Sequence, residues 1–404
     1  MERRDFLLAA TALGGVAAVP ASPAVANPSG PPAGSLSGAA LQELLRLLGE
    51  LQTEFLSGTY RIQTPGDLAE GQRLLLHLLN TAIDFWLEAD PERPVWTPYV
   101  TPARKLLGDN PDALYYFAPV REDRRYRIRG NLAGATFTSF TVEAGAAGGG
   151  AAGRSSAALD DQDMRVDADG NYEILVGGER PAKGNWLPLG QGAGQITTRH
   201  YYESRNCIVN QTAFTVPLTI EALDPPPLGP APGDAEIAER IATIGRFVRG
   251  MLQMSVAGGA GQGVRPDWFS VVPNVFNPPG QWLSETGYGN LHAHYCAAPF
   301  LLAPTEALLI EGEIPPCRFA NVVLWNRYMQ TFDYSRRPVS LNRSQMPFDD
   351  AGRYRIVIAH RDPGIPGWLD TEGRASGLVY WRFLLPRGKV PTPRARVVPA
   401  DSLG

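Results

Sequence analysis

The chain has 404 residues, of which 44% are hydrophobic and 19% charged, so it can bury one large core or two smaller ones. A formal net charge of -4 and a pI near 5.8 provide no basic surface for nucleic acid or for an anionic membrane, and we exclude both as partners. The 43 glycines and 36 prolines predict many short strands joined by turns.

The N-terminus has the pattern of an export signal. Arg3 and Arg4 stand directly before an apolar stretch, 6–19, and small residues suited to cleavage follow at 24–26. We expect residues 1–26 to be a twin-arginine signal peptide, removed on export to the periplasm or the outside of the cell. An uncleaved N-terminal anchor is the alternative, although the apolar stretch is short for a membrane span.

Three stretches have the apolar spacing of amphipathic helices. After a Pro/Gly/Ser linker, 27–38, leucines recur at helical spacing between 41 and 51, and a second helix follows Thr64, whose side chain can cap it. We expect a helical hairpin over 39–104 and a connecting helix over 231–256. Their apolar stripes are expected to pack into the core.

Short alternating runs make up most of the remaining sequence and predict strands, and two segments of these strands are copies of one another. The run 172–199 reappears in looser form as 354–382. In both copies a tyrosine is followed 14 residues later by a tryptophan, Trp186 or Trp368, and an arginine then ends a strand-like run. A strand repeat of this length indicates a duplicated β-sandwich rather than a solenoid.

The predicted fold is therefore mainly β, with two related jelly-roll-like β-sandwich units, an N-terminal helical hairpin and a connecting helix. The first unit is expected over 105–230 and the second over 257–404. Three cysteines, Cys207, Cys296 and Cys317, allow at most one internal disulfide, so hydrophobic packing has to hold this fold.

The duplicated arginines and tryptophans have two interpretations. Arg199 and Arg382 either bind loop carbonyls or a carboxylate within the fold, or they line a cleft where a guanidinium grips an anionic or polyhydroxy ligand. Trp186 is either a core anchor or part of such a cleft. Residues present in both copies usually serve the shared fold. The candidate substrate-binding residues are nonetheless Arg199, Arg382, Trp186 and Tyr288.

At 109–130 and 167–203 the sequence resembles the family known as domain of unknown function 1214. That family carries a DG-x-Y/L-x-I run, an NWLP block and an arginine that ends the following strand. In this chain the three motifs are Asp169-Gly170, residues 185–188 and Arg199.

This resemblance implies a jelly-roll β-sandwich, sometimes in tandem, in a family whose chemistry is largely unassigned. Some members are similar in fold to peptide-N-glycosidase F, a tandem jelly-roll amidase that acts on glycoproteins. The analogy is one of fold and carries no catalytic residue over to this chain. The second copy departs from the block, because Gly367 replaces the asparagine and Asp370 the proline.

The most suggestive cluster for chemistry is ETGYGNLHAHYCAAP, 285–299. His292 and His294 alternate onto one face of a predicted strand, close enough to share a metal ion or a substrate. This arrangement is that of a cupin metal site, but the glutamate that a cupin carries after the second histidine is missing. When the copies are aligned, the histidines fall over Asp112 and Leu114. They are therefore unique to the second copy, which function explains more easily than the shared fold does.

Acidic residues lie near these histidines in the sequence or in a neighbouring loop. Glu285 is in the same cluster, and Asp333 opens an arginine-rich stretch that takes the place of the Gly/Ala loop in the first copy. We predict that Glu285, His292, His294 and Asp333 converge in one cleft of the second unit as catalytic residues. The alternatives for the histidines are structural hydrogen bonding and metal ligation.

Two classes of function follow. The first is an exported enzyme with hydrolase-like acid-base chemistry on a small polar or glycan-like substrate, in which a histidine is the base and Glu285 or Asp333 its partner. The second is a non-catalytic exported protein that binds a carbohydrate or another small molecule. A metal-dependent enzyme that uses His292 and His294 is a further alternative, so a single metal ion is possible although no cofactor is favoured. No GxSxG, Walker or HExxH motif is present.

Overall fold

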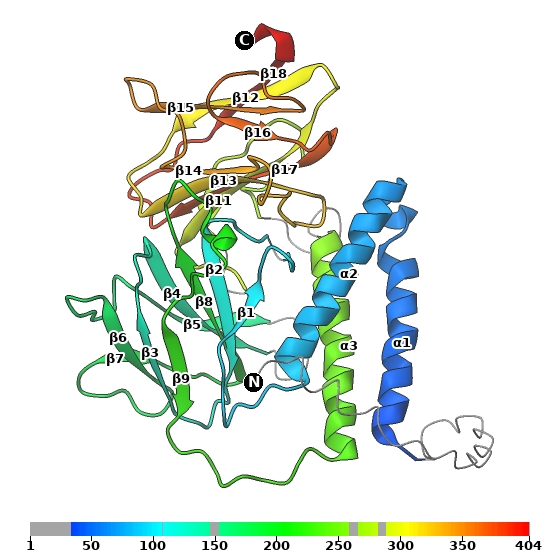
Figure 1. Cartoon of the computed structure of the whole chain (residues 1–404), viewed down its shortest axis with the longest axis vertical. Coiled ribbons are helices and arrows are strands. Elements are labelled where there is room, and N and C mark those ends of the chain that lie inside the picture. Colours follow the sequence, from blue (N-terminus) through cyan, green and yellow to red (C-terminus); the bar gives the residue numbers. More distant parts are fainter. Residues whose placement is uncertain (1–33, 107, 146–152, 258–265, 282–287, 404) are drawn as a thin grey trace, which may run out of the picture.

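A computed structural model describes residues 34–106, 108–145, 153–257, 266–281 and 288–403 (Figure 1). The expected signal peptide, Glu285 and most of the Gly/Ala loop of the first copy, 144–153, lie outside these residues. None of the helices within the described ranges combines the length and the apolar character that a membrane span requires.

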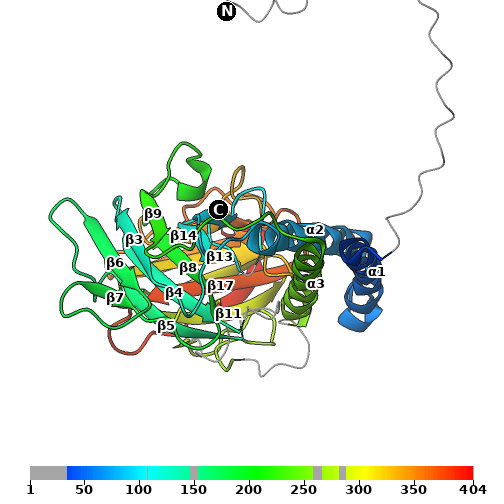
Figure 2. The same cartoon turned by 90° about the horizontal axis from the view of Figure 1, so that it is seen from below.

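Three helices stand side by side next to the sheets, α1 (Leu36–Phe55), α2 (Pro65–Trp86) and α3 (Asp234–Ala257) (Figures 1 and 2). Thr64 caps α2 as predicted, because its hydroxyl accepts a hydrogen bond of 3.0 Å from the Asp67 N–H. The Asp234 carboxylate accepts from the N–H groups of Leu36 and Ser37 at 2.7 and 3.1 Å. The predicted hairpin and the connecting helix therefore form one bundle.

The apolar stripe of α1 is only partly buried, contrary to the expectation that its leucines are core. Leu51 is fully buried, but Leu41 and Leu45 are 46% and 55% exposed. On α2 the buried face runs through Leu74 and Leu78, and Leu68 in the first turn is 41% exposed. The reason is the position of α1 at the outer side of the bundle, where only one line of its residues meets another helix (Figure 1).

The first unit contains nine strands: β1 (Thr97–Val100), β2 (Ala113–Pro119), β3 (Tyr126–Asn131), β4 (Phe137–Ala144), β5 (Arg154–Asp160), β6 (Asn171–Val176), β7 (Asn185–Leu187), β8 (Ala193–Tyr201) and β9 (Leu218–Ala222). They form a five-stranded sheet in the order β1-β2-β8-β4-β5 and a four-stranded sheet in the order β7-β6-β3-β9. Neighbouring strands are antiparallel except β6 and β7, which are parallel.

The second unit repeats this arrangement with β10 (Gly280–Gln281), β11 (Ala293–Leu301), β12 (Glu306–Glu313), β13 (Phe319–Trp325), β14 (Ser340–Asn342), β15 (Arg353–Ala359), β16 (Trp368–Asp370), β17 (Ser376–Leu384) and β18 (Arg394–Pro399). The sheet orders are β10-β11-β17-β13-β14 and β16-β15-β12-β18, and β15 and β16 are again parallel. The fold prediction of two similar sandwich-like units is confirmed. Short 3-10 turns lie at Gly58–Tyr60, Ile208–Asn210 and Ala400–Ser402.

The strand register gives the correspondence between the units residue by residue. Arg199 on β8 lies opposite Tyr115, and Arg382 on β17 lies opposite Tyr295. The two arginines are therefore equivalent, as the sequence repeat predicts. Register also places His292 at the position of Asp112.

In each unit a tyrosine ring packs closely against the backbone of a glycine on the neighbouring strand. A Cβ atom on Gly130 would lie 2.4 Å from the Tyr172 hydroxyl, and a Cβ atom on Gly312 would lie 2.4 Å from the Tyr354 hydroxyl. Each tyrosine lies directly opposite its glycine in the sheet. The tyrosine ring thus lies across a strand that has room for it only because the strand carries glycine.

Three large apolar cores hold the molecule together. Each sandwich has an interior of its own, and a third core joins the inner faces of the two five-stranded sheets to the helix bundle. Arg199 and Arg382 project into this third region, because they share a strand face with Tyr201 and Tyr380, which belong to it. The three cysteines are free thiols, so no disulfide joins Cys296 to Cys317.

Candidate functional site

His292 contacts the opposite unit. Its Nδ1 lies 3.0 Å from the Asp160 carboxylate of the first unit, and its ring lies 5.8 Å from that of Phe137. The Asp160 side chain is only 3% exposed. Burial favours protonation of this carboxyl, but hydrogen bonds from His292 and from backbone N–H groups outweigh it and lower its pKa.

The residue equivalent to His292 in the first unit, Asp112, also contacts the opposite unit. Asp112 accepts hydrogen bonds of 2.9 Å from Asn321 and from Asn342 of the second unit. Asn342 and Asp160 are themselves equivalent, since they lie opposite Asn321 and Ser139 at matching positions. The two contacts are therefore equivalent: each joins a residue just before the second strand of one five-stranded sheet to the opposite unit. They give His292 a structural role.

Asp333 does not lie near His292, so the predicted convergence of the catalytic set in one cleft is wrong for this pair. His292 stands just before β11, at the end of the sheet where β13 begins. Beyond the other end of β13, the neighbour of Asp333, Phe332, donates its N–H to the Leu324 carbonyl. The five residue steps from Phe319 to Leu324 span about 16 Å.

His294 lies within β11, half-buried, opposite Phe383 and Gln281. Burial lowers the pKa of its imidazole. Within the described ranges no group of three or more His, Cys, Asp or Glu side chains gathers closely enough to hold a metal ion. The metal-ligand interpretation of His292 and His294 therefore finds no third ligand among these residues.

Two of the predicted substrate-binding residues, Arg199 and Tyr288, form one buried network. The Arg199 guanidinium donates to the Tyr288 carbonyl at 2.8 Å and to the Thr141 hydroxyl at 3.0 Å, and it lies 4.0 Å from the Glu143 carboxylate. Glu143 also accepts from the Tyr288 N–H at 3.2 Å. Arg199 is thus satisfied by the protein itself.

The other two lie apart from this network. Arg382 is buried beside the rings of Trp325 and Tyr380, which stack on each other, and its guanidinium lies 5.0 and 4.8 Å from their centroids. Trp186 lies on the edge strand of the four-stranded sheet, where its indole N–H donates to the Gly177 carbonyl at 3.1 Å. Trp368 makes the same bond of 3.1 Å in the second unit, which marks this contact as part of the shared fold.

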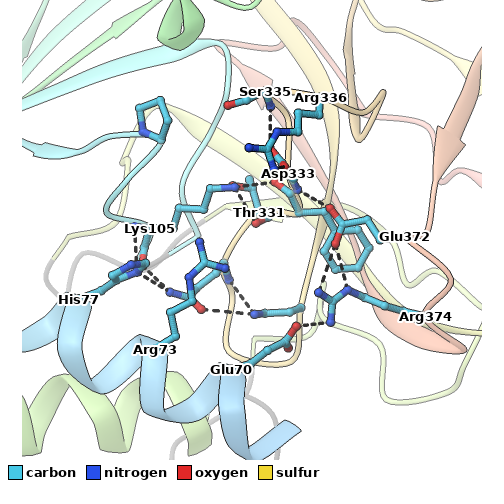
Figure 3. A pocket seen from close by; sticks show the side chains of 14 residues that line it. Glu70, Arg73, His77, Lys105, Thr331, Asp333, Ser335, Arg336, Glu372 and Arg374 are labelled. Atoms are coloured by element: carbon cyan, nitrogen blue, oxygen red, sulfur yellow. Dashed lines mark hydrogen bonds and ion pairs between the residues drawn. The ribbon is translucent and has the colours of Figure 1, made fainter. Parts of the chain in front are cut away.

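A pocket of about 350 Å³ opens where α2 and residues 102–105 meet the second unit (Figure 3). The second unit contributes the loop after β13 and the loop between β16 and β17. The side chains that line the pocket are almost all polar: Glu70, Arg73, His77, Lys105, Asn326, Gln330, Thr331, Asp333, Ser335, Arg336, Glu372 and Arg374, with Pro102 and Phe332.

Lys105 and His77 form one side of this pocket. The Lys105 ammonium donates to the carbonyls of Thr331 and Phe332 at 3.0 and 2.6 Å. Burial lowers the pKa of Lys105. His77 accepts at Nδ1 from the Lys105 N–H at 3.2 Å, and burial lowers its pKa, so the ring is neutral at pH 7.

The carboxylates on the opposite side are already paired. Arg374 bridges Glu70 and Glu372, and Glu372 accepts from the Asp333 N–H. Asp333 accepts from the Ser335 N–H at 3.1 Å. It also lies 3.4 Å from Arg336.

Arg73 is different, because its guanidinium has no hydrogen bond or ion pair with any residue that the structure describes. It rises from α2 toward Lys105 (Figure 3). Arg73, Lys105, Arg336 and Arg374 place four cations in the lining, against the three carboxylates of Glu70, Asp333 and Glu372. The pocket therefore has one uncommitted positive charge.

Of this lining, the sequence singled out Asp333 and the arginine-rich stretch that contains Arg336. The other members come from a helix and from loops that are distant along the chain, so no local motif marks them. One signal was available: the chain has 37 Lys and Arg residues together, but only three are lysines, and Lys105 is one of them.

Comparison with known proteins identifies part of the first unit. Residues 118–205 match the family described as "Protein of unknown function (DUF1214)". The match covers β8 with Arg199 and the block around Trp186, the residues on which the resemblance rests. Through strand register the matched segment corresponds to strands of the second unit as well.

Comparison with solved structures finds similarity over most of the chain. It is similar to an uncharacterized protein from Burkholderia cenocepacia, with 25% sequence identity, a TM-score of 0.79, and coverage of 91% of this chain and 99% of that one. The VPA0106 protein from Vibrio parahaemolyticus aligns with 12% identity and a TM-score of 0.49 over 81% of this chain and 98% of that one. None of the curated proteins matches.

Proposed function

We propose that the protein binds a small hydroxylated organic anion, such as a sugar acid, in the pocket between α2 and the second unit. The observation that carries this proposal is the guanidinium of Arg73, which pairs with no residue of the described ranges, in a lining whose carboxylates are all engaged. A carboxylate would complete the charge balance by accepting two parallel hydrogen bonds from this arginine.

The remaining lining supports a polyhydroxy ligand. Asn326, Gln330, Thr331 and Ser335 offer hydrogen-bonding groups around the charges. A site of this kind distinguishes hydroxylated molecules from apolar ones, because an apolar ligand would leave these groups without partners. Export by the twin-arginine route, proposed from Arg3 and Arg4, would bring such a binding protein to an extracytoplasmic ligand.

Acid-base catalysis in the same pocket is the second candidate function. It is favoured by Lys105, whose lowered pKa makes the ammonium a better proton donor and the amine more available as a base. Asp333, from the predicted catalytic set, lies in the same lining. Lys105→Met would abolish turnover of a bound substrate under this alternative and leave binding through Arg73 in place.

Thermal unfolding with added ligands tests the binding proposal. D-glucuronate and D-galacturonate are expected to raise the melting temperature of the wild type by a few degrees at saturating concentration, and neutral D-glucose is not. Arg73→Ala should remove the response. Arg361→Ala, which removes an exposed arginine of the second unit outside the pocket, should keep it. Equal responses to the acids and to glucose would overturn the proposal.

A further inference from the structure

The two equivalent arginines differ in what the protein provides for them. In the first unit, Arg199 lies opposite Ser139 of β4. Glu143 is four residues further along the same strand. In the second unit, Arg382 lies opposite Asn321, and four residues further along that strand is Trp325. The carboxylate that balances the first arginine is thus replaced by an indole ring at the second.

The two threonine hydroxyls that contact Arg199 are also replaced in the second unit. Arg199 contacts the hydroxyls of Thr141 and Thr197. By register the corresponding residues of the second unit are Val323 and Tyr380. Arg382 donates from Nη2 to the Gly108 carbonyl, but its Nη1 is buried without a hydrogen-bond partner in the described part of the chain.

The charge of Arg382 is also unbalanced at short range. The residue is 3% exposed, and no carboxylate of the described ranges lies within 4.0 Å of its guanidinium. Asp109 and Asp112 feel its charge from further away, but their oxygens accept hydrogen bonds from Thr331 and from the two asparagines. A buried cation without a close counter-ion is costly unless something else pairs with it.

Tyrosine hydroxyls surround this guanidinium. Its charge lies near enough to Tyr115, Tyr201 and Tyr380 to interact with each. These tyrosines and Tyr99, beside Arg199, are between 2% and 8% exposed, and no hydrogen bond joins their hydroxyls to any residue whose placement is described. Burial raises the pKa of Tyr99, Tyr115 and Tyr380, so these hydroxyls stay protonated and can donate.

We infer that Arg382 is the centre of a second binding site, between the two five-stranded sheets, for a small aromatic or apolar carboxylate. The anion would accept from Arg382 Nη1 and from the tyrosine hydroxyls, and its hydrocarbon part would contact rings such as those of Trp325 and Tyr380. Water could satisfy the hydroxyls but could not balance the charge. The site is separate from the Arg73 pocket and takes a different class of acid.

Isothermal titration with benzoate tests this inference, with uncharged benzamide and inorganic phosphate as comparison ligands. The wild type is expected to bind benzoate at least tenfold more tightly than either. Arg382→Met should weaken benzoate binding at least tenfold, and Arg382→Lys, which keeps the charge but loses the paired donors, should weaken it less. Arg73→Ala should leave it unchanged, which separates this site from the one proposed above.

The variants also need a stability readout, because Arg382 is buried. In buffer free of organic anions, Arg382→Met should melt no lower than the wild type, since it removes a buried cation that has no close counter-ion. If Arg382→Met does not fold, the comparison of wild type with Arg382→Lys decides. Wild-type binding of phosphate as tight as that of benzoate, or no benzoate binding at all, would overturn the inference.

Discussion

Asp112 of the first unit and His292 of the second occupy equivalent positions, and each contacts the opposite unit. The partner of Asp112 is Asn342 and the partner of His292 is Asp160, and these two partners are equivalent as well. The two copies therefore have a polar contact between the units at the same position, but with different residues in each copy. The contact with Asp160 gives His292 a structural role at the interface between the units.

His292→Ala should therefore lower the stability of the protein. The substitution leaves the buried Asp160 carboxylate without one of its donors, which costs about 1–3 kcal/mol. Urea unfolding of His292→Ala, Asp160→Asn and the double variant measures this, and the double variant should lose less than the sum of the single ones. A His292→Ala protein as stable as the wild type would return His292 to the list of functional candidates.

Asp112 should make stability depend on pH between about 4 and 6. Burial raises its pKa from 3.8 to about 6, against the effect of its hydrogen bonds from Asn342 and Asn321, with smaller influences from Arg382 and Glu203. The folded state thus keeps a proton that the unfolded state has released, and the contribution of Asp112 falls as pH rises through this window.

Urea unfolding at pH 4, 5, 6 and 7 compares the wild type with Asp112→Asn, which cannot titrate. Relative to the variant, the wild type should lose up to about 3 kcal/mol of its free energy of unfolding between pH 4 and 7, since each pKa unit corresponds to about 1.4 kcal/mol. Parallel profiles for the two proteins would show that folding does not raise the pKa of Asp112.

Gly130→Ala and Gly312→Ala should each destabilise the fold by about 1–3 kcal/mol. In both cases the added methyl group would lie 2.4 Å from a tyrosine hydroxyl, so the Tyr172 or Tyr354 ring would have to move. Gly49→Ala on the exposed side of α1 is the control, because a Cβ atom there meets nothing within 4 Å and alanine favours the helix by about 1 kcal/mol. Thermal unfolding should therefore give lower melting temperatures than the wild type for Gly130→Ala and Gly312→Ala, and a higher one for Gly49→Ala.

Arg199→Met should be strongly destabilising, by about 3–5 kcal/mol, because it leaves the buried Glu143 carboxylate without its cation. The double variant Arg199→Met/Glu143→Gln removes both charges and should recover part of the loss. Denaturant unfolding distinguishes these cases. If Arg199→Met costs no more than a surface substitution, then the buried pair does not stabilise the fold.

Much of the fold could be predicted because the sequence contains an internal repeat. The spacing from Tyr172 to Trp186 and from Tyr354 to Trp368 aligned the units, and the sheet register bears that alignment out. Local patterns also set the start of α2 at Thr64 and Pro65. The exposure of Leu41 and Leu45 could not be predicted, because it depends on which helices pack against α1.

The sites were harder to predict, because they lie where separate parts of the chain meet. His292 looked functional because the aligned residue of the first copy is Asp112, and the sequence does not show that its contact, Asp160, comes from that first copy. Arg199 and Arg382 could be paired from the sequence, but the exchange of Glu143 for Trp325 becomes visible only through the strand register. Arg73 and Lys105 belong to no motif and come together only where α2 packs against residues 102–105.

A crystal structure of the protein with the sugar acid that raises its melting temperature most is the measurement that tests the proposed function most directly. Our account predicts the carboxylate within hydrogen-bond distance of the Arg73 guanidinium and the hydroxyls against Asn326, Gln330 and Ser335. A ligand bound elsewhere, with the pocket between α2 and the second unit left to water, would contradict it.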